Sequence, residues 1–213
     1  FEGKNMNNTR KWILFAVVGA CLTQARSSQS GSIVNTKHDM STLAWNTTKT
    51  LCGVCHTPHN GKVGQPVLWN HTVTTAVFST YSSPTMQATA GQPSGTSKLC
   101  LSCHDGTVAL ENFGTVTNGT NYMPGTANLG TNLSNDHPVS ITYNTALSVS
   151  DPGLFDPATK QWGGAPAGTI QNMMLFANVM ECASCHDVHD NQWTKFLRKN
   201  NQGSGLCLTC HNK

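Results

Sequence analysis

The chain has 213 residues and a formal net charge of +3, with 38% apolar and only 11% charged residues. This length predicts one domain or two small ones, and so few apolar residues do not favour a large core made of side chains alone. The low charge argues against a solvated disordered chain, and the absence of a basic run argues against nucleic-acid binding. We therefore expect a bound group to fill part of the interior.

The start of the chain predicts export from the cytoplasm. Residues 6–25 have the parts of a signal peptide, with a basic start at Arg10 and Lys11, an apolar run over residues 12–20 and a small-x-small cleavage signal that ends at Ala25. The apolar run is too short to span a bilayer as a helix. We expect no membrane span in the mature domain.

Two further interpretations apply to this leader. Because Met6 is the natural start, residues 1–5 are interpreted as untranslated sequence that is read in frame. The sequence Val-Gly-Ala-Cys at residues 18–21 is also a weak lipobox, and lipidation at Cys21 is the alternative to cleavage after the leader. The domain that follows the leader is expected to span residues 26–213.

Few regular elements are expected after the leader. Residues 61–97 and 112–135 are rich in Gly, Thr, Ser, Asn and Pro with little periodicity, which predicts irregular connections. A short strand is predicted at residues 141–144, and a helix over residues 170–180, where apolar residues recur at helical spacing. A second short helix is predicted over residues 192–200. The expected fold class is mostly coil with a few short helices.

The cysteines follow a strict pattern. One of the nine, Cys21, lies in the leader, and the other eight form four C-x-x-C-H motifs with none left over. This is the pattern of haem c attachment, in which two thiols form thioethers with one porphyrin and the next imidazole binds the iron as proximal ligand. The sequence thus predicts four covalently bound haem c groups, at Cys52, Cys55 and His56; Cys100, Cys103 and His104; Cys182, Cys185 and His186; and Cys207, Cys210 and His211.

Three other readings of the cysteines explain less. Four disulfides would suit an exported domain, and two zinc sites with four thiolates each would use all eight cysteines. Neither explains why a histidine follows every second cysteine. A thioredoxin-like site requires a βαβ unit, which the sequence does not predict.

Each iron needs a sixth ligand, and five histidines remain to supply it. Methionine is an alternative ligand, but the close match between spare histidines and haems favours bis-histidine ligation. Such an iron is six-coordinate and has no open position for a substrate, so it would carry electrons. The remaining histidines are His38, His59, His71, His137 and His189.

An internal repeat separates these candidates. Residues about 33–110 and about 135–213 each hold a leading histidine, a C-x-x-C-H-x-x-H motif and a plain C-x-x-C-H motif, so each half is expected to supply its own distal ligands. His71 has no counterpart. It is expected to form a hydrogen bond or a haem-propionate contact, or to substitute for one of the other four. The predicted distal ligands are therefore His38, His59, His137 and His189.

The H-x-x-H spacing has a geometric consequence. His56 and His59 are three residues apart and cannot occupy opposite faces of one iron, so His59 must bind a different haem. The same reasoning applies to His186 and His189. Neighbouring haems are therefore expected to lie in close contact, with methionine and aromatic side chains packed on the porphyrins.

His59 is also a candidate ligand in trans. Only two residues follow His211, so the C-terminal haem is open to a neighbouring subunit, and we expect His59 to bind that iron. Such a contact is heterologous and generates an open head-to-tail filament. The alternatives are that His59 binds the second haem of its own chain, or that His38 crosses over instead.

These motifs resemble a known family. The matching segments resemble those of the doubled C-x-x-C-H multihaem cytochromes, and within them are most similar to the OmcE-like filament-forming tetrahaem cytochromes of metal-reducing bacteria. The resemblance covers most of residues 33–213. It implies a coil-rich chain wrapped around a continuous four-haem stack and subunits that polymerise into an extracellular conductive filament. The segments that carry it are His38-Asp-Met-Ser, Cys52-Gly-Val-Cys-His-Thr-Pro-His-Asn60, Pro66-Val-Leu-Trp-Asn70, Cys100-Leu-Ser-Cys-His-Asp-Gly-Thr-Val-Ala109 and Asp136-His-Pro-Val.

Three functions follow from this reading. The first is a secreted or cell-surface filament that accepts electrons from outer-membrane or periplasmic cytochromes and passes them to extracellular acceptors such as metal oxides. The second is a soluble periplasmic shuttle, but a shuttle usually has a charged docking face, which this chain lacks. The third is a multihaem reductase, which needs an open iron position. The sequence favours an electron carrier over an enzyme.

The four-haem interpretation makes a direct prediction. Mass spectrometry of the denatured mature protein should find the polypeptide plus four haem groups, because thioethers survive denaturation. Replacing Cys100 and Cys103 together by Ser should remove one haem and leave three. A protein with four disulfides, or with metal and no haem, would contradict it.

Overall fold

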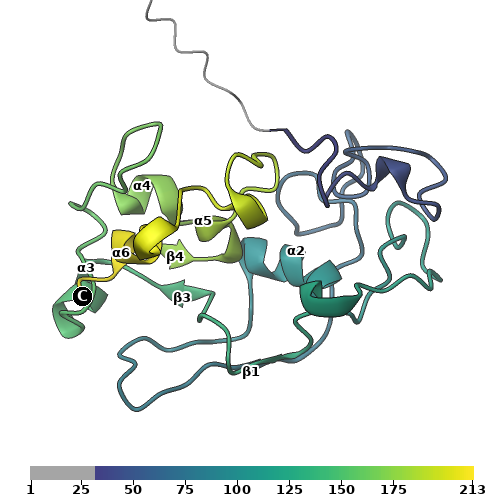
Figure 1. Cartoon of the computed structure of the whole chain (residues 1–213). Helices are drawn as coiled ribbons and strands as arrows, with labels where there is room; N and C mark the ends of the chain where they lie inside the picture. The colour runs from purple at the N-terminus through teal and green to yellow at the C-terminus, as the bar shows by residue number, and fades with distance from the viewer. Residues whose placement is uncertain (1–31) are drawn as a thin grey trace, which may run out of the picture. The chain divides into compact units, whose positions relative to one another are not determined.

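Long irregular segments make up most of the chain, with short helices and strands between them (Figure 1). The computed structural model describes residues 32–213. The predicted signal peptide, its cleavage site and Cys21 lie outside the described residues. The expected class, mostly coil with a few short helices, is confirmed for the described residues.

The helices are short, and three of them contain cysteine motifs. The longest, α2, ends at His104, while α5 and α6 each consist of one C-x-x-C sequence. The α-helices are α2 (Gly95–His104), α3 (Thr145–Ser150), α4 (Ile170–Met174), α5 (Cys182–Cys185) and α6 (Cys207–Cys210), and the 3-10 helices are η1 (Met40–Thr42), η2 (Gly125–Ala127), η3 (Thr194–Phe196) and η4 (Gln202–Ser204).

Two small sheets tie distant segments together. Strand β1 (Ser79–Thr80) pairs in parallel with β2 (Asn132–Leu133), with Ser79 opposite Asn132. Strand β3 (Ile141–Thr142) pairs antiparallel with β4 (Val179–Met180), with Ile141 opposite Met180. The strand predicted at residues 141–144 is thus confirmed in its first half.

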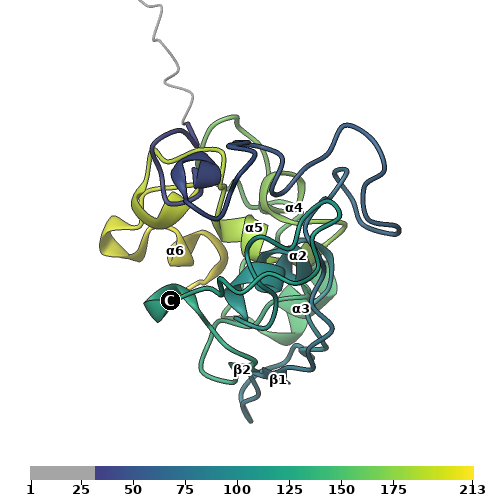
Figure 2. The same cartoon turned by 90° about the vertical axis from the view of Figure 1, so that its right-hand side faces the viewer.

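Helix α2 packs against α5, and Figures 1 and 2 show the two side by side. Helix α2 buries Leu99 and Leu101, and the N–H of Asp105 donates to the Leu101 carbonyl at its end, 2.9 Å away. The first backbone atoms of α5 meet the start of α2, where the Cys182 N–H donates to the Ser97 hydroxyl at 2.9 Å. The second and third cysteine motifs are therefore neighbours.

The helix predicted over residues 170–180 is only half present. Helix α4 ends at Met174, because Leu175 is extended, and Ala177 and Asn178 have positive φ angles. These two residues form a turn that leads into β4, whose ladder with β3 replaces the helical hydrogen bonds. The spacing of the apolar residues is compatible with either a helix or a strand after Met174, and the pairing of β4 with β3 selects the strand.

The prediction of a helix over residues 192–200 is wrong. Only the single 3-10 turn η3 forms there, and Lys195 and Phe196 both have positive φ angles that a continuous helix excludes. The backbone instead passes close to the third motif, where the Asp187 N–H donates to the Phe196 carbonyl at 2.8 Å.

A hydrophobic core of ordinary protein type lies in the C-terminal part of the chain. It centres on Ile170, Met174, Trp162 and Tyr143, and includes Met180. Several methionine and aromatic residues pack on one another here, which corrects the expectation that they pack on the porphyrins rather than in a separate core. Met174, Met180 and Tyr143 also line the cavity described below. None of the described helices is long and apolar enough to cross a membrane.

The packing of this core predicts that truncation of its central residue, Ile170, destabilises the fold. Ile170 is 0% exposed, so Ile170→Ala should lower the free energy of unfolding by about 2–5 kcal/mol through lost burial and the cavity left behind. Val149 is 76% exposed, and Val149→Ala should change it by less than about 0.5 kcal/mol. Denaturant unfolding of the holoprotein measures both, and equal effects would place Ile170 outside a tightly packed core.

Candidate functional site

Each cysteine motif forms one helical turn that ends on its histidine. The histidine N–H donates to the carbonyl of the first cysteine at 2.8 Å for His56 and at 3.0 Å for His186 and His211. All eight described cysteines are free, so the disulfide alternative is not found. Within residues 32–213, no group of three His, Cys, Asp or Glu side chains converges as a metal site, which disfavours the zinc alternative.

The second cysteine of each motif lies in an apolar environment. Burial raises the pKa of Cys55 and Cys185 to about 11 and that of Cys103 and Cys210 to about 12. Thiols with raised pKa values stay protonated at neutral pH, whereas a thiolate metal site requires the opposite. The surroundings of these sulfurs fit the edge of an apolar ring that they bind as thioethers.

The first cysteines of the second and third motifs meet each other. A hydrogen bond between the two thiols raises the pKa of Cys100 and lowers the pKa of Cys182. Groups attached at α2 and α5 would therefore have neighbouring attachment points. This contact agrees with the packing of the two helices.

Backbone carbonyls orient the C-x-x-C-H imidazoles. A hydrogen bond at Nδ1 fixes the tautomer and leaves Nε2 unprotonated, as a metal ligand requires. In three motifs, Nδ1 lies 2.8 Å from a carbonyl oxygen: His56 with Val67, His104 with Ala127 and His186 with Lys195.

Three pairs of histidine rings face each other at a common distance. The ring centres are 6.0 Å apart for His38 and His104, 6.1 Å for His56 and His189, and 6.3 Å for His137 and His211. With metal–nitrogen bonds of about 2 Å and a ring nitrogen about 1 Å from its ring centre, two imidazoles on opposite sides of one metal have centres about 6 Å apart. Each pair joins a C-x-x-C-H histidine to a predicted distal one.

One pair crosses the internal repeat. His189 belongs to the second half, whereas His56 belongs to the first. The sequence repeat suggested that each half supplies its own distal ligands, and the structure differs here. The H-x-x-H argument agrees with this arrangement, since His189 faces the histidine of a motif other than its own.

The half-buried ring of His38 is suited to ligation. Its Nδ1 is buried and has no hydrogen-bond partner among the described residues. Burial, followed by the histidines around it, lowers the pKa of His38 to about 4. The imidazole is therefore neutral at physiological pH, the form that binds a metal.

His71 is engaged on both sides of its ring. It is 0% exposed, and its Nδ1 and Nε2 lie 2.8 and 3.0 Å from the carbonyl oxygens of Thr72 and Ala109. Because a neutral imidazole carries a single N–H, it can donate to only one of these two carbonyls, but both nitrogens face backbone oxygen atoms. The hydrogen-bonding role expected for the histidine without a counterpart agrees with this geometry, and its Nε2 also lies 3.6 Å from the Cys103 sulfur.

The fourth histidine pair is not formed. Both His59 and His186 are exposed. Among residues 32–213, no histidine ring faces His186 at the distance of the other three pairs, and none faces His59. The structure thus brings together six of the eight predicted ligands.

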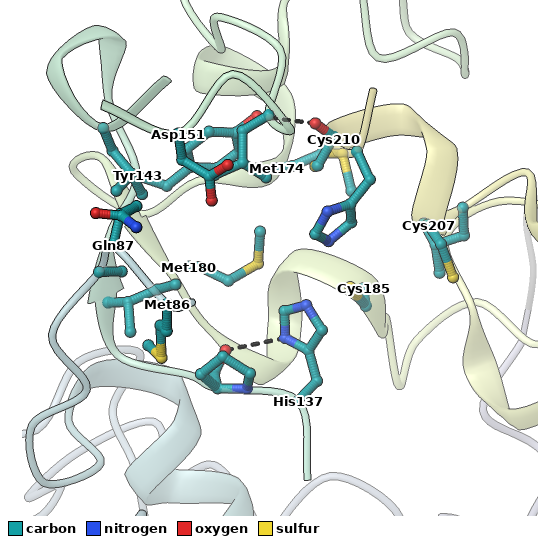
Figure 3. A pocket seen from close by; sticks show the side chains of 17 residues that line it. Met86, Gln87, His137, Tyr143, Asp151, Met174, Met180, Cys185, Cys207 and Cys210 are labelled. Atoms are coloured by element: carbon teal, nitrogen blue, oxygen red, sulfur yellow. Dashed lines mark hydrogen bonds between the residues drawn. The ribbon is translucent and has the colours of Figure 1, made fainter. Parts of the chain in front are cut away.

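A cavity of about 290 Å³ surrounds the pair formed by His137 and His211. Figure 3 shows His137 on one side of the open space, with Met180 and Cys210 also directed toward it. The walls are mainly apolar, and both cysteines of the fourth motif line them. An apolar space with two thiols at its edge and an imidazole pair across it fits a haem c group.

Comparison with known proteins agrees with this chemistry. Residues 176–213, which hold the third and fourth motifs, match the family described as "Doubled CXXCH motif". The search of curated proteins found no significant match. The match supports a multihaem c-type cytochrome that binds haem c covalently and takes part in electron transfer. Cytochromes of this type are exported, which agrees with the predicted leader.

The ring geometry predicts distinct spectra. The planes of His56 and His189 are inclined by 24°, and those of His137 and His211 by 75°. Near-parallel imidazoles on low-spin ferric iron give a rhombic EPR signal, and near-perpendicular ones give a strongly anisotropic signal. Oxidised holoprotein should show both.

Single substitutions assign these signals. His137→Ala should remove the strongly anisotropic signal and allow carbon monoxide to bind one reduced haem, while His189→Ala should remove the rhombic one. If His137→Ala left both signals unchanged, the pairing would be wrong.

Proposed function

We propose that this protein is the subunit of an extracellular filament that carries electrons through four bis-histidine haem c groups. The observation that supports it best is the set of three facing histidine pairs, each built from one C-x-x-C-H histidine and one distal candidate. Haem iron, when bound, supplies one-electron exchange between its ferric and ferrous states. The two imidazoles of each pair would hold the iron six-coordinate, which closes it to substrates.

The distal ligands are assigned from these pairs. His38 serves the iron held by His104, His189 the iron held by His56, and His137 the iron held by His211. Because His186 and His189 are three residues apart, the chain binds two irons within one turn of backbone. Such spacing keeps neighbouring porphyrins close, and closeness favours electron transfer between them.

The remaining ligand comes from a second copy. The sequence favoured the His211 iron as the acceptor of His59, but His137 already faces His211 at 6.3 Å. We therefore assign His59 of one subunit to the iron held by His186 of the next. Both side chains are exposed, and the loop after His59 presents Val63, which is 99% exposed, and Val67, which is 61% exposed.

This contact joins different surfaces of two subunits. It is heterologous, so it propagates as an open filament rather than closing as a symmetric dimer. The low charge of the chain suits a permanent contact better than a transient docking face. The proposed partners are further copies of the chain, upstream outer-membrane or periplasmic cytochromes, and extracellular acceptors such as metal oxides.

Replacing His59 tests assembly. His59→Ala should leave four haems attached but yield monomers, with one reduced iron open to carbon monoxide. Negative-stain imaging of the secreted fraction and a carbon monoxide difference spectrum measure the two effects. The matched control is Asn60→Gly at the next exposed position, where the φ angle of +56° is natural for glycine.

Three outcomes separate the alternatives. Normal filaments from His59→Ala would show that His59 is not a ligand to a neighbouring subunit. If the variant opens one iron while wild-type protein is already monomeric, His59 binds its own chain and the protein is a periplasmic shuttle. Carbon monoxide binding by wild-type filaments would favour a reductase.

A further inference from the structure

A buried carboxylate lies between the second and third cysteine motifs. Glu181 precedes Cys182 directly and is 3% exposed. Its Oε2 accepts hydrogen bonds from the Ser97 N–H at 3.2 Å and from the Ser140 hydroxyl at 3.1 Å. One carboxylate therefore touches the start of α2, which carries the second motif, and adjoins α5, which carries the third.

The start of α2 is shaped to receive this group. Gly95 has a φ angle of +47°, and a Cβ atom there would lie 2.8 Å from Oε1 of Glu181. A larger residue would displace the carboxylate from the helix N-terminus, where the backbone dipoles favour a negative charge. The Cys182 N–H also donates to the Ser97 hydroxyl at 2.9 Å, which holds α5 in the same place.

No opposite charge neutralises this carboxylate. Within residues 32–213, the only contact of ion-pair type joins His189 and Asp187, so neither Lys nor Arg pairs with Glu181. Both groups that donate to Oε2 are neutral. A charge buried in a medium of low dielectric constant acts over a longer distance than one in water.

We propose that Glu181 lowers the reduction potentials of the two haems attached at α2 and α5. Reduction adds one electron to a ferric iron and removes one positive charge. A neighbouring carboxylate stabilises the ferric state over the ferrous one and opposes that step. This inference rests on the haem ligation proposed above. Glu181 touches no iron, so it would act on the two haems through its negative charge.

The simpler alternative is that Glu181 only fixes the two helices together. A change of charge at constant shape distinguishes the two roles. Glu181→Gln keeps an acceptor oxygen but removes the charge, whereas Glu181→Asp keeps the charge. The matched control is Glu111→Gln, because Glu111 lies outside α2 and α5 and accepts hydrogen bonds from the Thr120 and Asn121 backbone.

A redox titration of the holoprotein, followed by visible and EPR spectra, gives the test. In Glu181→Gln, the ratio of reduced to oxidised iron at fixed potential should rise about tenfold for two of the four haems, a shift of about 59 mV for a one-electron couple. Glu181→Asp and Glu111→Gln should leave all four near their wild-type values. Unchanged potentials in a folded Glu181→Gln protein would leave only the structural role.

Two further measurements keep the outcome clear. If Glu181→Gln does not accumulate, Ser140→Lys places a cation beside the same carboxylate and should raise the same two potentials; no rise would overturn the proposal. Carbon monoxide binding and imaging of these variants report ligation and assembly separately. A defect there would count against the proposed function, whereas the potentials alone decide the role of Glu181.

Discussion

In the proposed haem ligation, two imidazoles on opposite faces of one iron are the constraint on which the rest of this structure depends. A C-x-x-C-H turn supplies two thiols and one imidazole from the same side, so the second imidazole must come from another segment. Long irregular connections separate His38 from His104 and His137 from His211, whereas His189 follows one motif directly and faces the histidine of another. This explains why a chain with two-residue strands and four-residue helices still has a defined path.

Side-chain hydrogen bonds hold the irregular connections in place where no helix or strand does so. The buried Asp105 carboxylate accepts from the Thr74 hydroxyl at 2.6 Å and from the Thr107 N–H at 2.7 Å, which pins a loop against the end of α2. Threonine and asparagine are frequent in the connections because their short side chains bind nearby backbone in turns. Among residues 32–213, the larger apolar core forms near Ile170, and a smaller one joins Phe78, Leu101 and Leu133.

The parts of the fold and site that depend on residues close together in the sequence could be predicted. The cysteines and their histidines are identified by spacing within five residues, and the structure keeps each motif as one turn. The helix over residues 170–180 failed because Asn178 turns the chain back so that β4 can pair with β3. The contact between His56 and His189 depends on where two distant halves meet, and a repeat in sequence does not determine which half supplies a ligand. Glu181 carries no motif, and only its burial against α2 reveals it.

Three histidine pairs form within one chain, whereas His59 and His186 are exposed and unpaired with any described histidine. This difference suggests a role for the two exposed histidines in assembly. If all four irons were closed within one chain, assembly would need a separate surface, and this chain has few charges to build one. An iron that lacks one ligand provides a directional bond that only a histidine at the correct distance can form. The same bond would place the porphyrin of the third motif of one subunit against the first motif of another. Ligation, assembly and continuity of the electron path would then be a single event, and the proposed filament would depend on these two exposed histidines.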